Sequence, residues 1–317
     1  MQRFNISKSN LKQLIKKVSI FYLFVFSCTA FSQQIPHYTQ YLYNMQIINP
    51  AYVGVRSDLS LSALSREQWS GISGAPTTRT FSVNGRTRLG LGLGVTFTND
   101  KIGLSEINNI NVDGSYTIIT SENSRLSFGL KLGSTFFSNN LANGITPDND
   151  SYASNSGNFY NVGFGAFFYS DNFFVGLSVP YLLESPQFFI QPDDREIRVA
   201  ENQDYFLSAG YLFELSEDLL FKPSTMIRYT TELPISIDLN SNFMYKELLE
   251  AGISYRYNNS ISAMFAIIFN KKFRIGYAYD YTTNDVIGNF NTHEFILHVD
   301  LDLKRNTRWL RSVNCYF

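Results

Sequence analysis

Cysteine is almost absent from this chain, which excludes two kinds of site. The 317 residues include only Cys28 and Cys315. Cys28 lies in an N-terminal stretch with the pattern of a cleavable export signal, so Cys315 alone is expected in the mature chain. A single cysteine can form neither an intramolecular disulfide nor a paired-thiol metal site.

Long apolar runs are also missing, which excludes a bundle of membrane helices. Beyond the first 32 residues, the longest purely apolar run is 263–269, far short of the about 20 residues that a membrane-spanning helix requires. Proline is scarce, with nine residues, whereas Tyr and Phe number 20 and 28. Few prolines and many aromatic residues are typical of a chain made mostly of strands.

Groups suited to catalysis are few. The three histidines are His37, His293 and His298. His293 and His298 lie five residues apart in one expected strand, so they face opposite sides and cannot bind one ion. A membrane lipase would need a serine beside His293, which lies on the apolar side, but a lone histidine there is more often structural. With neither an HExxH sequence nor a phosphate loop after a strand, we expect no enzymatic activity, cofactor or metal site.

Residues 1–32 are predicted to form an export signal rather than part of the fold. A basic region precedes an apolar stretch at 18–26 and a small-x-small cleavage sequence at 30–32. A lipoprotein signal at Cys28 is the weaker alternative, because Phe26 is bulky where a small residue is usual. Cleavage removes five of the 26 basic residues and none of the 27 acidic ones, leaving a net charge of −6. This mildly acidic balance does not fit a nucleic-acid-binding protein.

What the sequence does contain, from residue 57 to residue 303, is a repeat of about ten alternating residues and a turn. In the clearest unit, residues 89–98, every odd position is apolar and every even one is Gly or Thr. Successive side chains of a strand point to opposite faces, so one face is apolar and the other small and polar. About 9–11 residues are also what a tilted strand needs to cross a bilayer.

The repeat predicts an all-β fold, a transmembrane antiparallel β-barrel of about 14 strands (range 12–16). The predicted strands are 57–66, 78–86, 88–98, 106–119, 124–137, 158–170, 172–179, 203–214, 218–230, 234–245, 248–257, 260–270, 272–281 and 292–303. A soluble β-sandwich also alternates, but it rarely has so many strands of this length. Aromatic residues near strand ends fit a membrane interface better, for example Tyr229, Tyr245, Tyr255 and Tyr279.

The lengths of the connections support an even number of strands. The longest ones all follow odd-numbered strands and are 138–157, 180–202, 67–77 and 282–291. Long outer loops and short periplasmic turns are usual in outer-membrane barrels. We therefore expect a barrel at 57–303 with long extracellular loops, after an N-terminal periplasmic or plug segment at 33–56. Residues 304–317 are expected to be a C-terminal tail or a final strand.

Charged residues on the polar side of the strands have both signs. They are Lys131, Arg228, Arg256 and Arg274, against Asp238, Asp280, Asp300 and Asp302. A ring of one sign would favour an ion-selective pore, whereas mixed charges are expected to pair across a narrow lumen. Plugging of the lumen by segment 33–56, by the 138–157 loop or by the C-terminal tail is a further hypothesis.

The residues around the first predicted strand do not follow the repeat. Asn49-Pro50 and Gly54 are expected to bend the chain, since proline fixes its own φ and restricts the residue before it. In the first long loop, Trp69 can bury a large flat face while its N–H finds a partner.

This segment resembles the PorP/SprF family of the type IX secretion system of Bacteroidota. The family pattern is QY-x-x-N, then NPAY-x-G, then R-x-QW-x-G-I-x-GAP-x-T. The matching positions are Gln40, Tyr41, Asn44, Asn49, Pro50, Ala51, Tyr52, Gly54, Arg66, Gln68, Trp69, Gly71, Ile72, Gly74, Ala75, Pro76 and Thr78. The motif covers only residues 40–78 directly, but the signal, the barrel pattern and the length agree along the chain.

The resemblance implies a non-enzymatic outer-membrane protein that helps to export or anchor a cell-surface protein, such as a gliding adhesin, through that partner's C-terminal secretion domain. Some members are linked to the periplasmic ring and peptidoglycan-binding components of the machine, and outer-membrane lipid is a further expected partner. The signature residues are expected either to set turns and pack a loop or to contact a partner. The alternative function, which rests on barrel architecture alone, is a porin or small-solute transporter.

Overall fold

The computed structural model describes residues 38–87, 89–140, 154–183, 186–190, 197–200, 203–231, 233–283 and 291–303. The expected export signal and the tail at 304–317 lie outside the described residues. So do both cysteines and His37.

The described residues form strands and three short 3-10 turns. The strands are β1 (Leu59–Glu67), β2 (Thr77–Arg86), β3 (Leu91–Ile102), β4 (Ser105–Ile119), β5 (Ser124–Asn139), β6 (Asn155–Ser170), β7 (Phe173–Val179), β8 (Pro186–Ile190), β9 (Ile197–Ala200), β10 (Asp204–Tyr211), β11 (Phe213–Ser216), β12 (Leu219–Thr230), β13 (Ser236–Tyr245), β14 (Leu249–Arg256), β15 (Ser260–Phe269), β16 (Phe273–Thr282) and β17 (Asn291–Leu301). The turns are η1 (Tyr41–Tyr43), η2 (Met45–Ile47) and η3 (Pro50–Tyr52). Within the described ranges, no helix is long and apolar enough to cross a membrane.

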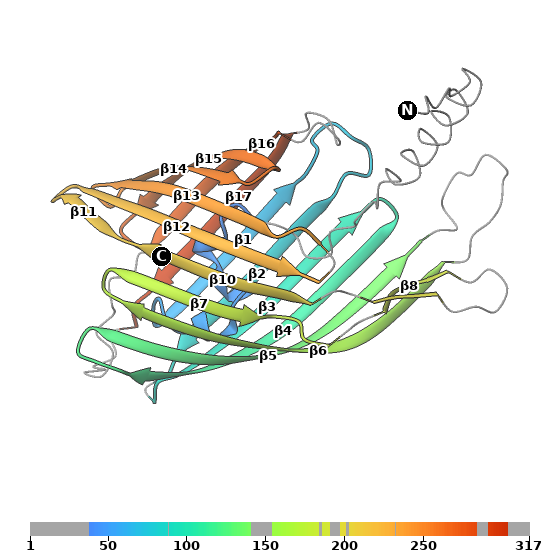
Figure 1. Ribbon diagram of the computed structural model, residues 1–317, viewed down its shortest axis with the longest axis horizontal. Helices are drawn as coiled ribbons and strands as arrows, with labels where there is room; N and C mark the ends of the chain where they lie inside the picture. The colour runs from blue at the N-terminus through green and yellow to red at the C-terminus, as the bar shows by residue number, and fades with distance from the viewer. Residues whose placement is uncertain are drawn as a thin grey trace, which may run out of the picture. The chain divides into compact units, whose positions relative to one another are not determined.

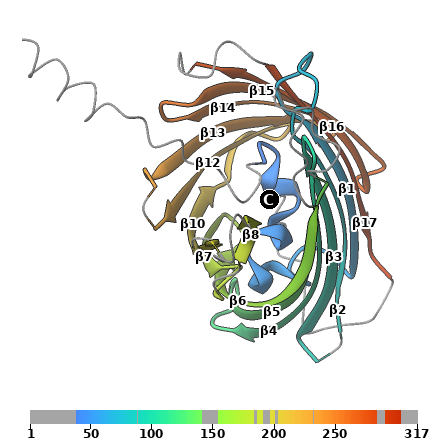
Figure 2. The same cartoon turned by 90° about the vertical axis from the view of Figure 1, so that its right-hand side faces the viewer.

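The long strands close into an antiparallel ring (Figures 1 and 2). Consecutive strands pair as neighbours, β1 pairs with β17, and β10 pairs with both β7 and β12. β11 continues β10 beyond Leu212 and pairs with the same β12, so the described residues give fourteen strand positions around the ring. This confirms the predicted barrel and its number of strands. The predicted strand 203–214 is divided between β10 and β11.

A small hairpin is not part of the ring. β8 and β9 pair only with each other among the described strands, in a connection for which the sequence predicts only a loop. These strands have five and four residues. They are too short to show the alternation of about ten residues that predicts a membrane strand.

The two faces of the ring have opposite chemistry. In β15, buried and exposed residues alternate without interruption. Ser260 and Ser262 are buried, whereas Ile261 and Phe265 on the opposite face are 47% and 48% exposed. A polar interior and an apolar exterior are the arrangement of a transmembrane barrel.

The longest connections follow β1, β5, β7 and β16. Because neighbouring strands are antiparallel, the strand ends that flank these connections all lie at one end of the ring, which we call the long-loop end (Figure 1). Connections at the opposite end are short turns, such as 171–172 between β6 and β7. The exposed Tyr229 and Tyr255 lie near the long-loop end, and the exposed Tyr245 ends β13 at the other. Aromatic residues thus mark both ends of the apolar belt, as predicted.

The core of the molecule lies inside the ring. Residues 38–56, which we call the luminal segment, carry the three 3-10 turns, and residues 38–55 are all buried. Figure 2, which looks into the ring, shows these turns enclosed by the strands. Their apolar side chains share one buried cluster with Phe167, Phe174, Phe206 and Met226 of the wall.

Candidate functional site

The start of the luminal segment is fixed to the seam between the first and last strands. The backbone N–H groups of Thr39 and Gln40 donate to the two carboxylate oxygens of Glu294 on β17, at 3.0 and 2.7 Å. Arg66 on β1 lies 3.0 Å from Glu294 and 2.8 Å from Asp280 on β16. The Thr39 hydroxyl also donates to Asp280, at 2.8 Å. We call these five residues the latch; because its hydrogen bonds involve charged groups, they are stronger than neutral ones.

Two tyrosines of η1 contact the wall at β13 and β16. Asn240 on β13 donates to the Tyr41 hydroxyl at 2.8 Å. The Arg274 guanidinium lies 4.5 Å from the centre of the Tyr43 ring, a cation–π contact. Burial raises the pKa of both Tyr41 and Tyr43 well above the ordinary value, so both phenols stay protonated.

Asn44 and Gln46 attach the middle of the segment to a third part of the wall. Ser82 on β2 donates to Asn44 at 2.9 Å. The Gln46 amide donates to Asp113 on β4 and accepts from Asn84 on β2, each at 2.9 Å. The position of Gln46 is therefore set by both ends of its amide, although the family pattern does not include it.

The Asn49-Pro50-Ala51 turn lies directly against wall glycines. The Asn49 side chain accepts from the Ala51 N–H at 2.9 Å, which caps η3, and donates to the Ala166 carbonyl at 3.1 Å. A Cβ added at Gly129 would lie 2.2 Å from the Ala51 nitrogen, and one at Gly165 would lie 2.1 Å from the Asn49 side-chain oxygen. These two glycines make room for the turn.

The end of the segment also depends on a glycine. Gly54 has a φ of +72°, a conformation that residues with a Cβ rarely adopt. Its N–H donates to Asn84 at 3.2 Å. Just before it, the Tyr52 ring packs edge-on against Phe167, with centroids 5.4 Å apart. The predicted bend at Asn49-Pro50 and Gly54 is present.

The mixed charges of the wall pair as predicted. The four basic residues expected in the lumen each contact an acid: Lys131 with Asp113 at 2.7 Å, Arg228 with Asp204 at 2.8 Å, Arg256 with Asp238 at 2.7 Å and Arg274 with Glu250 at 3.4 Å. Asp300 pairs with Arg56 at 2.6 Å. Asp302 is an exception, because it is exposed beyond the end of β17. The luminal charges therefore neutralise one another locally rather than forming a ring of one sign.

The two described histidines face opposite sides, as predicted. His298 is buried and lies 2.6 Å from the Ser62 hydroxyl and 3.1 Å from Asp300. His293 lies on the outer face, 2.8 Å from the Tyr277 hydroxyl. Within the described ranges, no group of three or more His, Cys, Asp or Glu residues is placed to hold a metal ion.

The family signature divides into two groups. The buried group belongs to the luminal segment and its wall: Gln40, Tyr41, Asn44, Asn49, Pro50, Ala51, Tyr52, Gly54, Arg66 and Thr78. Thr78 donates to Asp100 at 2.6 Å and contacts neither the latch nor Trp69 by any hydrogen bond described. The second group forms the β1–β2 loop: Gln68, Trp69, Gly71, Ile72, Gly74, Ala75 and Pro76.

The β1–β2 loop is tightly turned and joined to its neighbour. Its ends meet where the Gln68 N–H donates to the Pro76 carbonyl at 2.9 Å. Trp69, Gly71 and Gly74 have φ values of 49°, 95° and 78°. The N–H of Gly103, in the β3–β4 turn, donates to the Gly74 carbonyl at 2.9 Å.

The joined loops present apolar side chains at the long-loop end. Ile72 is 40% exposed, and Ile102 and Leu104 beside the β3–β4 turn are 43% and 41% exposed. Trp69 is only partly buried, and its indole N–H has no hydrogen-bond acceptor among the described residues. We call these four residues the loop-tip patch.

Sequence reasoning missed the acids of the latch. The strand alternation predicts Asp280 only as a residue of the polar side, and the charged residues predicted there do not include Glu294. The contact of Glu294 with Arg66 depends on the register of β1 and β17, in which the two residues lie directly opposite each other. The sequence signal that could have identified Glu294 is its place on the polar side of the last predicted strand.

Solved structures similar to this chain include an outer membrane protein and a transporter. Omp33 of Acinetobacter baumannii is 9% identical, with 78% of this chain and 100% of that chain covered, at a TM-score of 0.44. The toluene transporter TbuX of Ralstonia pickettii is 8% identical, with 81% and 92% covered, at a TM-score of 0.49. Such distant similarities carry no information about what this chain binds.

No curated protein sequence matches the chain. By contrast, residues 30–299 match the family model described as type IX secretion system membrane protein PorP/SprF. The match extends from before the luminal segment to the last strand of the barrel and includes every signature residue. The chain therefore belongs to the PorP/SprF family of membrane proteins of the type IX secretion system.

Proposed function

We propose that this protein is a non-enzymatic outer-membrane component of type IX secretion that helps to export or anchor one cognate cell-surface protein. The partner would carry a C-terminal secretion domain, and a gliding adhesin is the kind of protein that fits. The observation that carries the proposal is the occupied lumen. A barrel with its interior filled offers a partner its rim and its loops rather than a path through its centre.

The contacts of the luminal segment support a scaffold rather than a pore. Within twenty residues, the segment contacts β17, β13, β2, β4 and β6 through Gln40, Tyr41, Asn44, Gln46 and Asn49. These strands lie on all sides of the ring. A porin would need a wide aqueous path bounded by charges that solutes can meet, whereas most of the described luminal charges here are paired.

The loop-tip patch is the surface that we assign to the partner. It exposes Ile72, Ile102 and Leu104 at the long-loop end, which would face outward if the N-terminus is periplasmic. Apolar side chains gathered on loops above a rigid scaffold are typical of binding surfaces. Periplasmic ring and peptidoglycan-binding components would meet the opposite end.

Deletion of the gene tests the proposal. We expect one or a few surface proteins to disappear from the cell surface, while permeability to small solutes stays normal. Surface proteomics and antibiotic or dye uptake measure the two effects, and reintroduction of the wild-type gene is the control. An unchanged surface proteome would contradict the proposal, and loss of uptake of one solute class would favour the transporter instead.

A further inference from the structure

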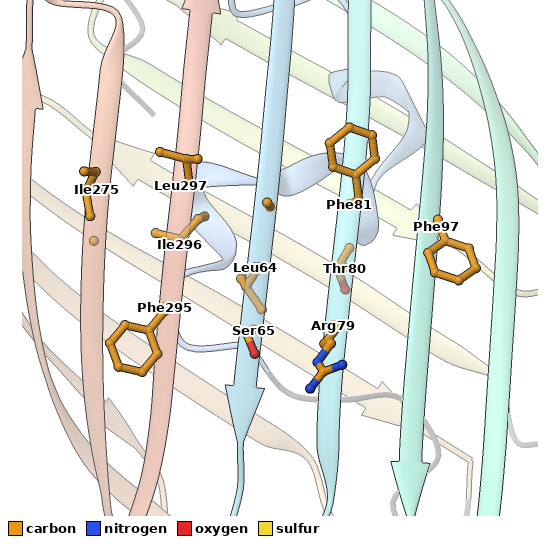
Figure 3. Close-up of a pocket in the computed structure, with 12 residues that line it drawn as sticks. Leu64, Ser65, Arg79, Thr80, Phe81, Phe97, Ile275, Phe295, Ile296 and Leu297 are labelled. Carbon is orange, nitrogen blue, oxygen red and sulfur yellow. The ribbon is translucent and has the colours of Figure 1, made fainter.

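An open groove follows the outer face of the barrel at its seam (Figure 3). It has a volume of about 660 Å³ and crosses β16, β17, β1, β2 and β3. Its floor is made by Ala63 and Ser65 of β1, which lie in register between Phe81 of β2 and Leu297 and Phe295 of β17. Small residues between two rows of large ones create the depression. Its volume is within the range of about 300–1,000 Å³ usual for ligand sites.

One end of the groove carries a single cation. Arg79 on β2 lies opposite Ser65 in the β1–β2 ladder, and Figure 3 shows its side chain over β2 beside Ser65. The side chain is exposed and has no ion pair or hydrogen bond among the described residues. It differs in this from Arg66 inside the same seam, which contacts two carboxylates.

The level of Arg79 in the membrane follows from the register. An unpaired cation on a lipid-facing strand costs about 2–4 kcal/mol at the centre of the bilayer but about 0–1 kcal/mol near its surface. Arg79 is the third residue of β2 and lies opposite Asn99 of β3, one outward-facing pair beyond Phe81 and Phe97 toward the long-loop end. Phe81 and Phe97 are exposed residues of the apolar outer face, so Arg79 lies where that apolar face ends, at the level where lipid headgroups meet their acyl chains.

We propose that the groove binds one anionic, phosphate-bearing membrane lipid, with an acyl chain along Ala63 and Ser65 and the phosphate on Arg79. The groove opens toward the lipid side of the barrel, so a lipid reaches it without any rearrangement. Arginine is also well suited to this task, because its planar guanidinium can donate two parallel hydrogen bonds to a phosphate. The site is independent of the function proposed above.

Native mass spectrometry of the detergent-solubilised full chain tests the site, with dioleoylphosphatidylglycerol as the probe. We expect a bound lipid whose affinity falls at least about tenfold in Arg79→Gln, equivalent to about 1.4 kcal/mol. Ala63→Phe should weaken binding by filling the floor. The matched control is Lys101→Gln, because Lys101 is an exposed cation on β3 that does not line the groove. Heat-modifiable mobility on gels checks that each variant is folded.

The outcomes separate a site from surface charge. Loss of affinity in Arg79→Gln and Ala63→Phe, with Lys101→Gln unchanged, supports the proposal. If Lys101→Gln weakens binding as much as Arg79→Gln, the lipid responds to net charge alone and the proposal is wrong. It is also wrong if Arg79→Gln binds like the wild type, or if a protein copy rather than a lipid remains bound to the groove after purification.

Discussion

Arg66 serves two parts of the molecule through one guanidinium. It neutralises Glu294 and Asp280, and Glu294 in turn accepts the first two N–H groups of the luminal segment. The side chains of Arg66, Asp280 and Glu294 are 4%, 4% and 0% exposed, so water cannot replace a missing partner. Removing one member of a buried charged group leaves the others uncompensated.

We therefore predict that Arg66→Gln lowers the free energy of unfolding by about 3–5 kcal/mol. Urea unfolding of the protein in lipid vesicles, followed by tryptophan fluorescence, measures the change. Lys101→Gln is the control, since it removes an exposed cation of β3 with no ion pair among the described residues and should shift stability by less than about 0.5 kcal/mol. Equal unfolding curves for Arg66→Gln and the wild type would show that the latch does not hold the fold.

For single residues, the sequence predicts which charged side chains face the lumen better than it predicts which residues they contact. The parity of each strand places Lys131, Arg228 and Arg256 on the polar face, and all three are buried there. It cannot show that Arg66 meets Glu294, because 228 residues separate them and their contact depends on register around the whole ring.

The luminal segment is the element on which the interior depends. Its Asn49-Pro50-Ala51 turn approaches the wall so closely that glycine is required at 129 and 165. The sequence does not decide whether segment 33–56 is a periplasmic extension or a plug. The segment has no strand alternation, and without a periodic pattern its position relative to the barrel cannot be predicted. Strands are predictable because their period of two is written in the sequence.

Gly129→Val is predicted to push the 49–51 turn away from the wall, at a cost of about 1–3 kcal/mol for overpacking. In a Cys315→Ser background, an Ala51→Cys thiol should then react faster with maleimide, because Ala51 is fully buried in the native protein. The control is Gly114→Val, where an added Cβ meets nothing within 4 Å. Equally slow labelling in both variants would mean that the turn tolerates the side chain.

The β1–β2 loop is the second element, and its predicted role is contact with the partner. Trp69→Ala combined with Ile72→Ser should reduce the surface level of the cognate protein while changing the free energy of unfolding by less than about 0.5 kcal/mol. Flow cytometry with an antibody to the surface protein measures the effect. Leu248→Ser, which alters an exposed apolar residue in a turn at the opposite end, is the control. A normal surface level in the loop variant would remove the loop-tip patch from the proposal.

For the whole molecule, the filled ring predicts the conductance of the protein in a planar bilayer. The wild-type protein should give no large, steady conductance in a planar bilayer. Deletion of residues 41–52, which removes η1, η2 and η3, should open the lumen and raise the conductance. Gel mobility before and after heating checks that the shortened protein is folded. A large open pore in the wild type would favour a porin, and a silent deletion variant would show that other parts block the lumen.

The position of Glu294 also has a consequence for biogenesis. β17 is the last of the described strands to be synthesised, and its pairing with β1 seals the cylinder. Until it arrives, Arg66 lacks one of its two carboxylates and the Thr39 and Gln40 amides lack their acceptor. Closure of the ring therefore also completes the bonds that hold the luminal segment, and a barrel that closed without the segment would lack these bonds. Only a barrel that closes around the luminal segment gains the full stability of the β1–β17 pairing, which would favour the correctly assembled product.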